Sequence, residues 1–127
     1  ELQHQAKDSK AAQATYDAIA ADSGVDRVYR DLAGYYAASL MLENGGGPEL
    51  EKRLQAMSNK DNVWHLSVNE LRGLNQYKMG QREAAVKTFK DLLANAPADS
   101  GFKLRAQQMR AVLGVPADEI KAQLVTE

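Results

Sequence analysis

The sequence predicts an all-α protein in which antiparallel helix pairs stack on one another. The 127-residue chain is rich in alanine and has only three prolines. No run of residues alternates apolar with polar side chains, as a half-buried strand would. Glycine, asparagine and proline interrupt the chain at intervals of roughly 10 to 20 residues, which is the usual length of a globular helix. We therefore expect about seven helices joined by short turns.

The first two expected helices each carry an apolar row at helical spacing. The first spans residues 3–21 and stops at the breaker formed by Ser23 and Gly24. Its apolar face consists of Ala12, Tyr16, Ile19 and Ala20. The second spans residues 26–43 and stops at the glycine-rich turn of residues 44–48. Its inward row consists of Val28, Tyr29, Leu32, Tyr36 and Leu40.

The third and fourth expected helices follow the glycine-rich turn. Pro48 suits the first turn of a helix, because the amide proton that proline lacks would have no partner there. Leu50, Leu54 and Met57 follow it at helical spacing. The fourth helix spans residues 62–79, and its inward row consists of Trp64, Val68 and Leu71.

Three further helices are expected after Gly80. The fifth spans residues 81–95 and stops before Pro97, because a residue that precedes proline disfavours helical backbone angles. Its inward row consists of Ala85, Phe89, Leu92 and Leu93. The sixth starts near Ser100 and carries Leu104, Met109, Val112 and Leu113. The seventh starts at Pro116 or Ala117 and carries Ile120 and Leu124.

A repeat of 35 residues runs through these helices. Sliding the sequence by 35 pairs Tyr29 with Trp64, Ala33 with Val68, Tyr36 with Leu71, Ala38 with Gly73, and Gly45 with Gly80. The same slide pairs Leu50 with Ala85, Leu54 with Phe89, and Met57 with Leu92. The first helix matches the fifth at a separation of 73, so that Tyr16 corresponds to Phe89. One helix pair cannot bury both of its apolar rows, so the pairs are expected to stack and share a core.

Small residues and aromatic residues recur within this repeat. Ala38 and Gly73 are expected to let neighbouring backbones approach closely, and Ala85 is where the opposing helix is expected to cross. Gly45 and Gly80 supply the positive backbone angle that a tight turn between helices needs. The aromatic residues at equivalent positions are interpreted as core residues: Tyr16, Tyr29, Tyr36, Trp64 and Phe89.

Six residues of the fourth and fifth helices and the turn after them occur at the spacings of the tetratricopeptide repeat. They are Gly73, Tyr77, Gly80, Ala85, Phe89 and Pro97. Over nearly its whole length the chain resembles the divergent tetratricopeptide-like domain of bacterial membrane-anchored proteins related to the ancillary subunit of the Sec translocon. The resemblance implies one domain over residues 1–127, folded as a short tetratricopeptide-like right-handed superhelix. Residues 62–97 match the repeat pattern best, residues 26–60 match it more weakly, and both ends of the chain are partial repeats.

The resemblance also implies a groove that binds a partner. In that family the first helix of each pair lines the groove, on the face turned away from the second helix. Transferred to the matching positions of the fourth helix, the groove residues are Ser67, Glu70, Leu74, Tyr77 and Lys78. Carried back by 35, they are Leu32, Tyr35, Ser39, Leu42 and Glu43. This mixture suits a surface that receives a peptide or a partner helix, although the three leucines are also candidates for packing inside the stack.

The composition shows no constellation for catalysis or cofactor binding. The formal net charge of -1 does not favour a nucleic-acid partner. The absence of cysteine excludes disulfides and thiolate metal sites. Neither His4 nor His65 has a second histidine at metal-ligand spacing. The glycine run of residues 45–47 lacks the lysine that follows in a phosphate-binding loop. We expect no metal, no cofactor and no enzymatic activity, so an enzyme or a small-ligand carrier is the least favoured class.

The leading hypothesis is a non-enzymatic module that binds other proteins or peptide segments. The resemblance implies the periplasmic face of a bacterial inner membrane, with translocon subunits or periplasmic chaperones as partners. The membrane would be reached only through a segment absent from this chain, and the start at Glu1 without methionine fits that plan. A cytoplasmic scaffold is the alternative location. Self-association is the alternative role, because the helix after Pro116 would expose Ile120 and Leu124 where terminal repeats are normally polar.

Overall fold

Six α-helices follow one another in the computed structural model, which describes residues 2–114. They are α1 (Leu2–Ala20), α2 (Arg27–Glu43), α3 (Pro48–Met57), α4 (His65–Lys78), α5 (Arg82–Asn95) and α6 (Gly101–Leu113). No strand occurs within residues 2–114, so the all-α prediction is confirmed. The seventh expected helix, from Pro116, lies outside the described residues.

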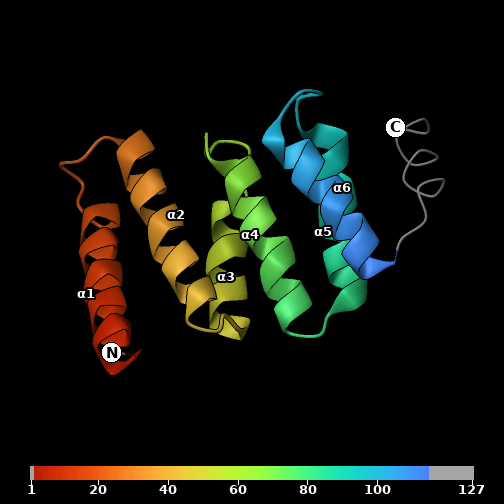
Figure 1. Cartoon of the computed structure of the whole chain (residues 1–127). Helices are drawn as coiled ribbons and strands as arrows, with labels where there is room; N and C mark the ends of the chain where they lie inside the picture. The colour runs from red at the N-terminus through yellow and green to blue at the C-terminus, as the bar shows by residue number, and fades with distance from the viewer. Residues whose placement is uncertain (1, 115–127) are drawn as a thin grey trace.

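The helices stack as antiparallel pairs that form two layers (Figure 1). In the front layer α4 lies between α2 and α6 and contacts both. The helices α3 and α5 lie behind this layer, and each packs against α4. At one end of the stack α1 packs along α2. The predicted stack of helix pairs is thus present in the structure.

Two clusters of buried side chains form the core. The first joins α2, α3 and α4 and consists of Ala38, Leu42, Leu50, Leu54, Val68 and Leu71. The second joins α5 and α6 and consists of Ala85, Phe89, Leu92, Leu93, Ala106 and Leu113. Leu74 of α4 packs against both clusters and connects them. The clusters confirm the expected burial of Leu50 and Leu54 on α3, of Val68 and Leu71 on α4, and of the whole predicted row of α5.

The Phe89 ring of the second cluster packs directly against Gly73 of α4. A Cβ atom added at Gly73 would lie 2.7 Å from Cζ of Phe89, which is closer than real carbon contacts. A residue without a side chain is therefore needed at this position for the Phe89 ring to pack against α4. The two glycines of the tight turns behave as expected, because φ is +116° at Gly45 and +75° at Gly80.

The 35-residue repeat is visible in polar contacts between helices at equivalent positions. Several side chains contact a residue 35 or 36 positions earlier, and all but the first of these contacts join helices that the repeat makes equivalent. These contacts are Asn44 Nδ2 with Ser9 Oγ at 3.0 Å, Arg53 Nη1 with Asp17 Oδ1 at 2.7 Å, Trp64 Nε1 with the Val28 carbonyl at 3.0 Å, Lys78 Nζ with the Leu42 carbonyl at 2.9 Å, and Arg105 with Glu70. The stack therefore has the period that the sequence predicts.

The packing of α2 differs from the expected one. Its buried residues are Ala33, Ala37, Ala38 and Leu42. By contrast, Val28, Tyr29 and Tyr36 are 44%, 61% and 43% exposed, so the expectation that these three residues are in the core was wrong. Close packing explains the difference. The alanines let the neighbouring helices approach α2, whereas tyrosines on the same side would hold those helices apart.

The same correction applies to α6. The expected row of this helix included Leu104 and Val112, but both side chains are exposed. Leu113 is buried as expected and Met109 packs at the edge of the core, whereas Ala106 takes the place of Leu104 and Val112. The small side chain of Ala106 lets α6 lie close to α5, as the alanines of α2 do at the other end of the stack.

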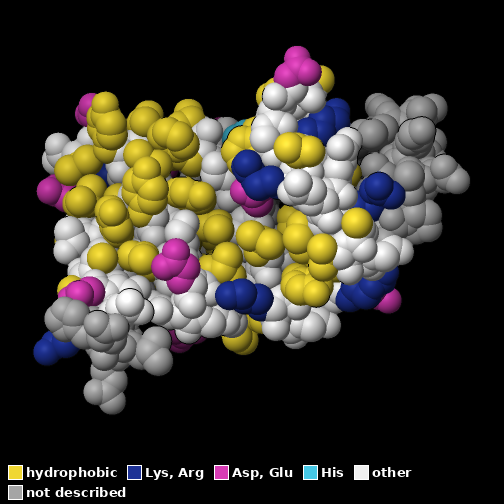
Figure 2. Space-filling view, in the orientation of Figure 1, with side chains coloured by type: hydrophobic (Ala, Val, Ile, Leu, Met, Phe, Trp, Pro, Cys, Tyr) yellow, Lys and Arg dark blue, Asp and Glu magenta, His cyan; other side chains and the backbone are white. Residues whose placement is uncertain are grey.

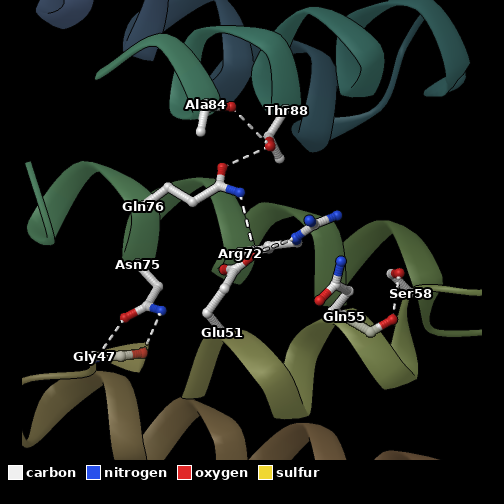
Figure 3. Close-up of polar contacts among 9 residues, drawn as sticks. All are labelled: Gly47, Glu51, Gln55, Ser58, Arg72, Asn75, Gln76, Ala84 and Thr88. Atoms are coloured by element: carbon white, nitrogen blue, oxygen red, sulfur yellow. Dashed lines mark hydrogen bonds and ion pairs between the residues drawn. The ribbon is translucent and has the colours of Figure 1, made fainter. Parts of the chain in front are cut away.

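A buried amide fixes the glycine-rich turn between α2 and α3 against α4 (Figure 3). Asn75 is fully buried. The amide N–H of Gly47 donates to Asn75 Oδ1 at 2.8 Å, and Asn75 Nδ2 donates to the Gly47 carbonyl at 3.0 Å. A Cβ atom on Gly46 would lie 2.2 Å from Asn75 Oδ1, so the turn has no room for a side chain there. The turn is therefore specified both by its glycines and by Asn75.

A second polar group links α3, α4 and α5 beside this amide (Figure 3). Glu51 Oε1 accepts hydrogen bonds from Arg72 Nε at 2.7 Å and from Gln76 Nε2 at 3.3 Å. Thr88 Oγ1 donates to Gln76 Oε1 at 2.6 Å. Because the Arg72 and Glu51 side chains are only 26% and 20% exposed, their ion pair is largely shielded from solvent.

Replacing Arg72 with alanine is expected to lower the free energy of unfolding by about 1–2 kcal/mol, because Glu51 would lose its charged partner in a largely buried setting. The matched control is Arg27→Ala, which breaks a more exposed pair with Asp31 and should cost less than about 0.5 kcal/mol. Urea unfolding followed by circular dichroism measures both. Equal costs for the two variants would contradict the role given to the Arg72 pair.

Candidate functional site

The ten predicted groove residues lie on α2 and α4, which are neighbours in the front layer. Most of them are half-buried: Leu32, Tyr35, Ser39, Ser67, Glu70 and Leu74. Glu43, Tyr77 and Lys78 are exposed. The side chain of Leu42 belongs to the core. The structure thus brings the predicted residues onto adjacent helices and places them at different depths.

Three residues occupy the same repeat position on the three helices of the front layer, and two of them are in contact. Glu70 of α4 accepts a charge-assisted hydrogen bond from Arg105 Nε of α6. This hydrogen bond raises the pKa of the Arg105 guanidinium against a smaller lowering by burial, and the negative charge of Glu70 and the nearby Tyr35 of α2 add to the rise. Tyr35, Glu70 and Arg105 are each 35 positions apart, so they are the same repeat position on successive helices. The predicted set did not include Arg105, although one more slide of 35 from Glu70 reaches it.

Lys78 has a structural role at the edge of the predicted groove. Its ammonium group donates to the Leu42 carbonyl at 2.9 Å. Leu42 lies in the last turn of α2, where carbonyl groups lack helical partners and a positive charge is favourable. Lys78 therefore ties α4 to the end of α2.

Tyr77 lies at an open hollow between α4 and α6. The side chain is 45% exposed. The hollow has a volume of about 500 Å³ and is lined by Tyr77, Lys78, Gly80, Arg82, Val112 and Leu113. Val112 is 57% exposed on the α6 side. An aromatic ring and an aliphatic side chain therefore face solvent together at this end of the front layer.

A larger apolar surface lies at the other end of the front layer. We call it the aromatic patch and define it by Tyr16 of α1 and by Val28, Tyr29, Leu32 and Tyr36 of α2. The rings of Tyr16 and Tyr36 have centroids 5.3 Å apart, and those of Tyr35 and Tyr36 are 5.7 Å apart. Figure 2 shows apolar side chains gathered over the α1 and α2 end of this face.

The aromatic patch is the main surface feature that the sequence interpretation did not predict. The signal was present in α2, which carries alanines on one side and tyrosines on another. A helix that is apolar on more than one side normally has partners on each of those sides. The interpretation assigned the tyrosine side to the core and used only Ala38 of the alanine side, as a position of close approach.

Another hollow, between α3, α4 and α5, is smaller than a typical small-molecule site. It has a volume of about 160 Å³, and Lys60, His65 and Arg72 are among its polar lining residues. That volume is well below the several hundred Å³ typical of small-molecule sites. Among residues 2–114, no three His, Asp or Glu side chains gather as metal ligands would.

The helices within residues 2–114 were also compared with the requirements for crossing a bilayer. Each of them is too short or too polar to span one.

Comparison with known proteins gives no relative. No protein-family model matches the chain, and no curated protein or solved structure matches it either.

Proposed function

We propose that this protein is a non-enzymatic interaction module whose front layer, formed by α2, α4 and α6, receives segments of other proteins. The observation that carries the proposal is the exposure of large apolar side chains on that layer. Tyr29, Tyr36, Tyr77 and Val112 are each more than two-fifths exposed. Tyrosine is enriched at protein interfaces, where it supplies a large contact area at a low cost in side-chain entropy.

The proposed setting follows from the resemblance to the membrane-anchored tetratricopeptide-like proteins. In that setting the domain faces the bacterial periplasm and assists a translocon, a chaperone or envelope assembly. The residues that support it are those of the repeat, above all Gly73, Phe89 and the turn glycine Gly80. A cytoplasmic scaffold with the same front layer is the alternative setting.

Photo-crosslinking in the source cells tests the proposed function. A benzoylphenylalanine placed at Tyr35 or Tyr77 is expected to crosslink to partner proteins. The same group at Lys52, which is exposed on α3 of the back layer, is expected to give none above background. If positions 35 and 77 yield no more adducts than position 52, the front layer does not bind proteins and the proposal fails.

A further inference from the structure

Two residues of the aromatic patch, Tyr29 and Tyr36, correspond by the 35-residue repeat to residues at the start of α4 and within it that pack against α2. Tyr29 corresponds to Trp64, whose indole Nε1 donates to the Val28 carbonyl of α2 at 3.0 Å. Tyr36 corresponds to Leu71, which is buried in the cluster that α2 shares with α3 and α4. Within residues 2–114, no helix covers Tyr29 and Tyr36 in this way.

The α1 residue of the patch, Tyr16, also indicates a position for an additional helix. Tyr16 corresponds to Phe89 of α5, whose ring packs against Gly73 of α4. In α1 the equivalent ring is half-buried and lies against Tyr36. Both α1 and α2 therefore carry the contact residues for one more helix, placed before α2 as α2 is placed before α4.

We propose that the aromatic patch binds one amphipathic α-helix from a partner protein in this position. The inference rests on the proposed function and narrows it by naming the kind of partner segment. By the repeat, the bound helix presents glycine or alanine to Tyr16, as Gly73 does to Phe89.

The size and the charge of the patch favour a single helix over a second copy of this chain. A tyrosine buries on the order of 150–250 Å², so Val28, Tyr29 and Tyr36, the three exposed members of the patch, together leave roughly 300 Å² exposed. The half-buried Tyr16 and Leu32 add less than this. A stable interface between two folded proteins takes about 800 Å² from each partner. The patch itself carries no charge, and Arg27 at its edge pairs with Asp31. An apolar stripe of one helix matches this area and this neutrality.

A phage-displayed library of single helices, selected on the 127-residue chain, tests the inference. We expect the selected peptides to share apolar residues at positions i, i+3 or i+4, and i+7 around a central glycine or alanine. Binding of the fluorescein-labelled peptides, measured by anisotropy, should weaken at least tenfold for Tyr29→Ser. Binding should change less than twofold for Leu104→Ser, the matched control, because Leu104 is an exposed apolar side chain of α6 outside the patch. Tyr77→Ser is measured beside these two variants.

Each other outcome overturns the inference in a distinguishable way. Peptides that depend on Tyr77 and not on Tyr29 would leave the proposed function standing and move the binding surface. If no helix is enriched on this chain beyond its enrichment on an unrelated helical-bundle protein, the aromatic patch does not bind a helix and the inference fails. The crosslinks at positions 35 and 77 test the proposed function separately. A concentration-dependent dimer that Tyr29→Ser disperses in sedimentation equilibrium would identify a second copy as the occupant.

Discussion

Replacing Gly73 with valine is expected to lower the free energy of unfolding by about 3 kcal/mol, the upper end of the usual cost of overpacking a core. The first carbon of the new side chain would lie 2.7 Å from Cζ and 2.8 Å from Cε2 of Phe89. The Phe89 ring is itself buried between α4 and α6 and cannot yield by turning away. Gly73→Ala should cost less, because alanine gains about 1 kcal/mol of helix propensity over glycine. Urea unfolding followed by far-ultraviolet circular dichroism measures both changes.

A second substitution tests whether the Phe89 ring is the cause. Phe89→Leu alone leaves a cavity and destabilises the protein. Combined with Gly73→Val, however, it should recover at least half of the valine cost, because the clash is removed. Ala18→Val on the exposed side of α1 is the matched control and should cost less than about 1 kcal/mol. Strictly additive costs for Gly73→Val and Phe89→Leu would show that the two side chains do not compete for the same space.

Replacing Asn75 with alanine is expected to lower the free energy of unfolding by about 2–4 kcal/mol. The side chain is fully buried and satisfies both the amide N–H and the carbonyl of Gly47. Each polar group left without a partner costs roughly 1–3 kcal/mol. The same substitution should speed hydrogen exchange at the Gly47 amide, because its hydrogen-bond acceptor is removed.

An exposed asparagine provides the comparison for Asn75. Asn95 Nδ2 donates to the Asp91 carbonyl at 2.7 Å on the surface of α5. Water can replace that bond, so Asn95→Ala should cost less than about 1 kcal/mol. If Asn75→Ala and Asn95→Ala unfold at the same urea concentration, Asn75 does not hold the glycine-rich turn.

Part of the candidate site could be predicted from the repeat alone. Equivalent positions occur on neighbouring helices of the front layer, so a spacing of 35 relates Tyr35 of α2 to Glu70 of α4. One further step gives Arg105, which the family pattern did not include. The period cannot show depth, however. Leu42 and Ser39 are three positions apart on one helix, yet only Leu42 belongs to the core, because depth depends on how closely the neighbouring helix approaches.

The sequence by itself determined the helical class, the period and the buried rows of α3 and α5, because aliphatic residues at helical spacing leave only one apolar side to bury. It also determined the close contact at Gly73. Only the tertiary structure decided which side of α2 is buried, because that helix has two apolar sides. The alanine side allows closer packing with its neighbours, and Tyr29 and Tyr36 are therefore left on the surface, where they form the aromatic patch.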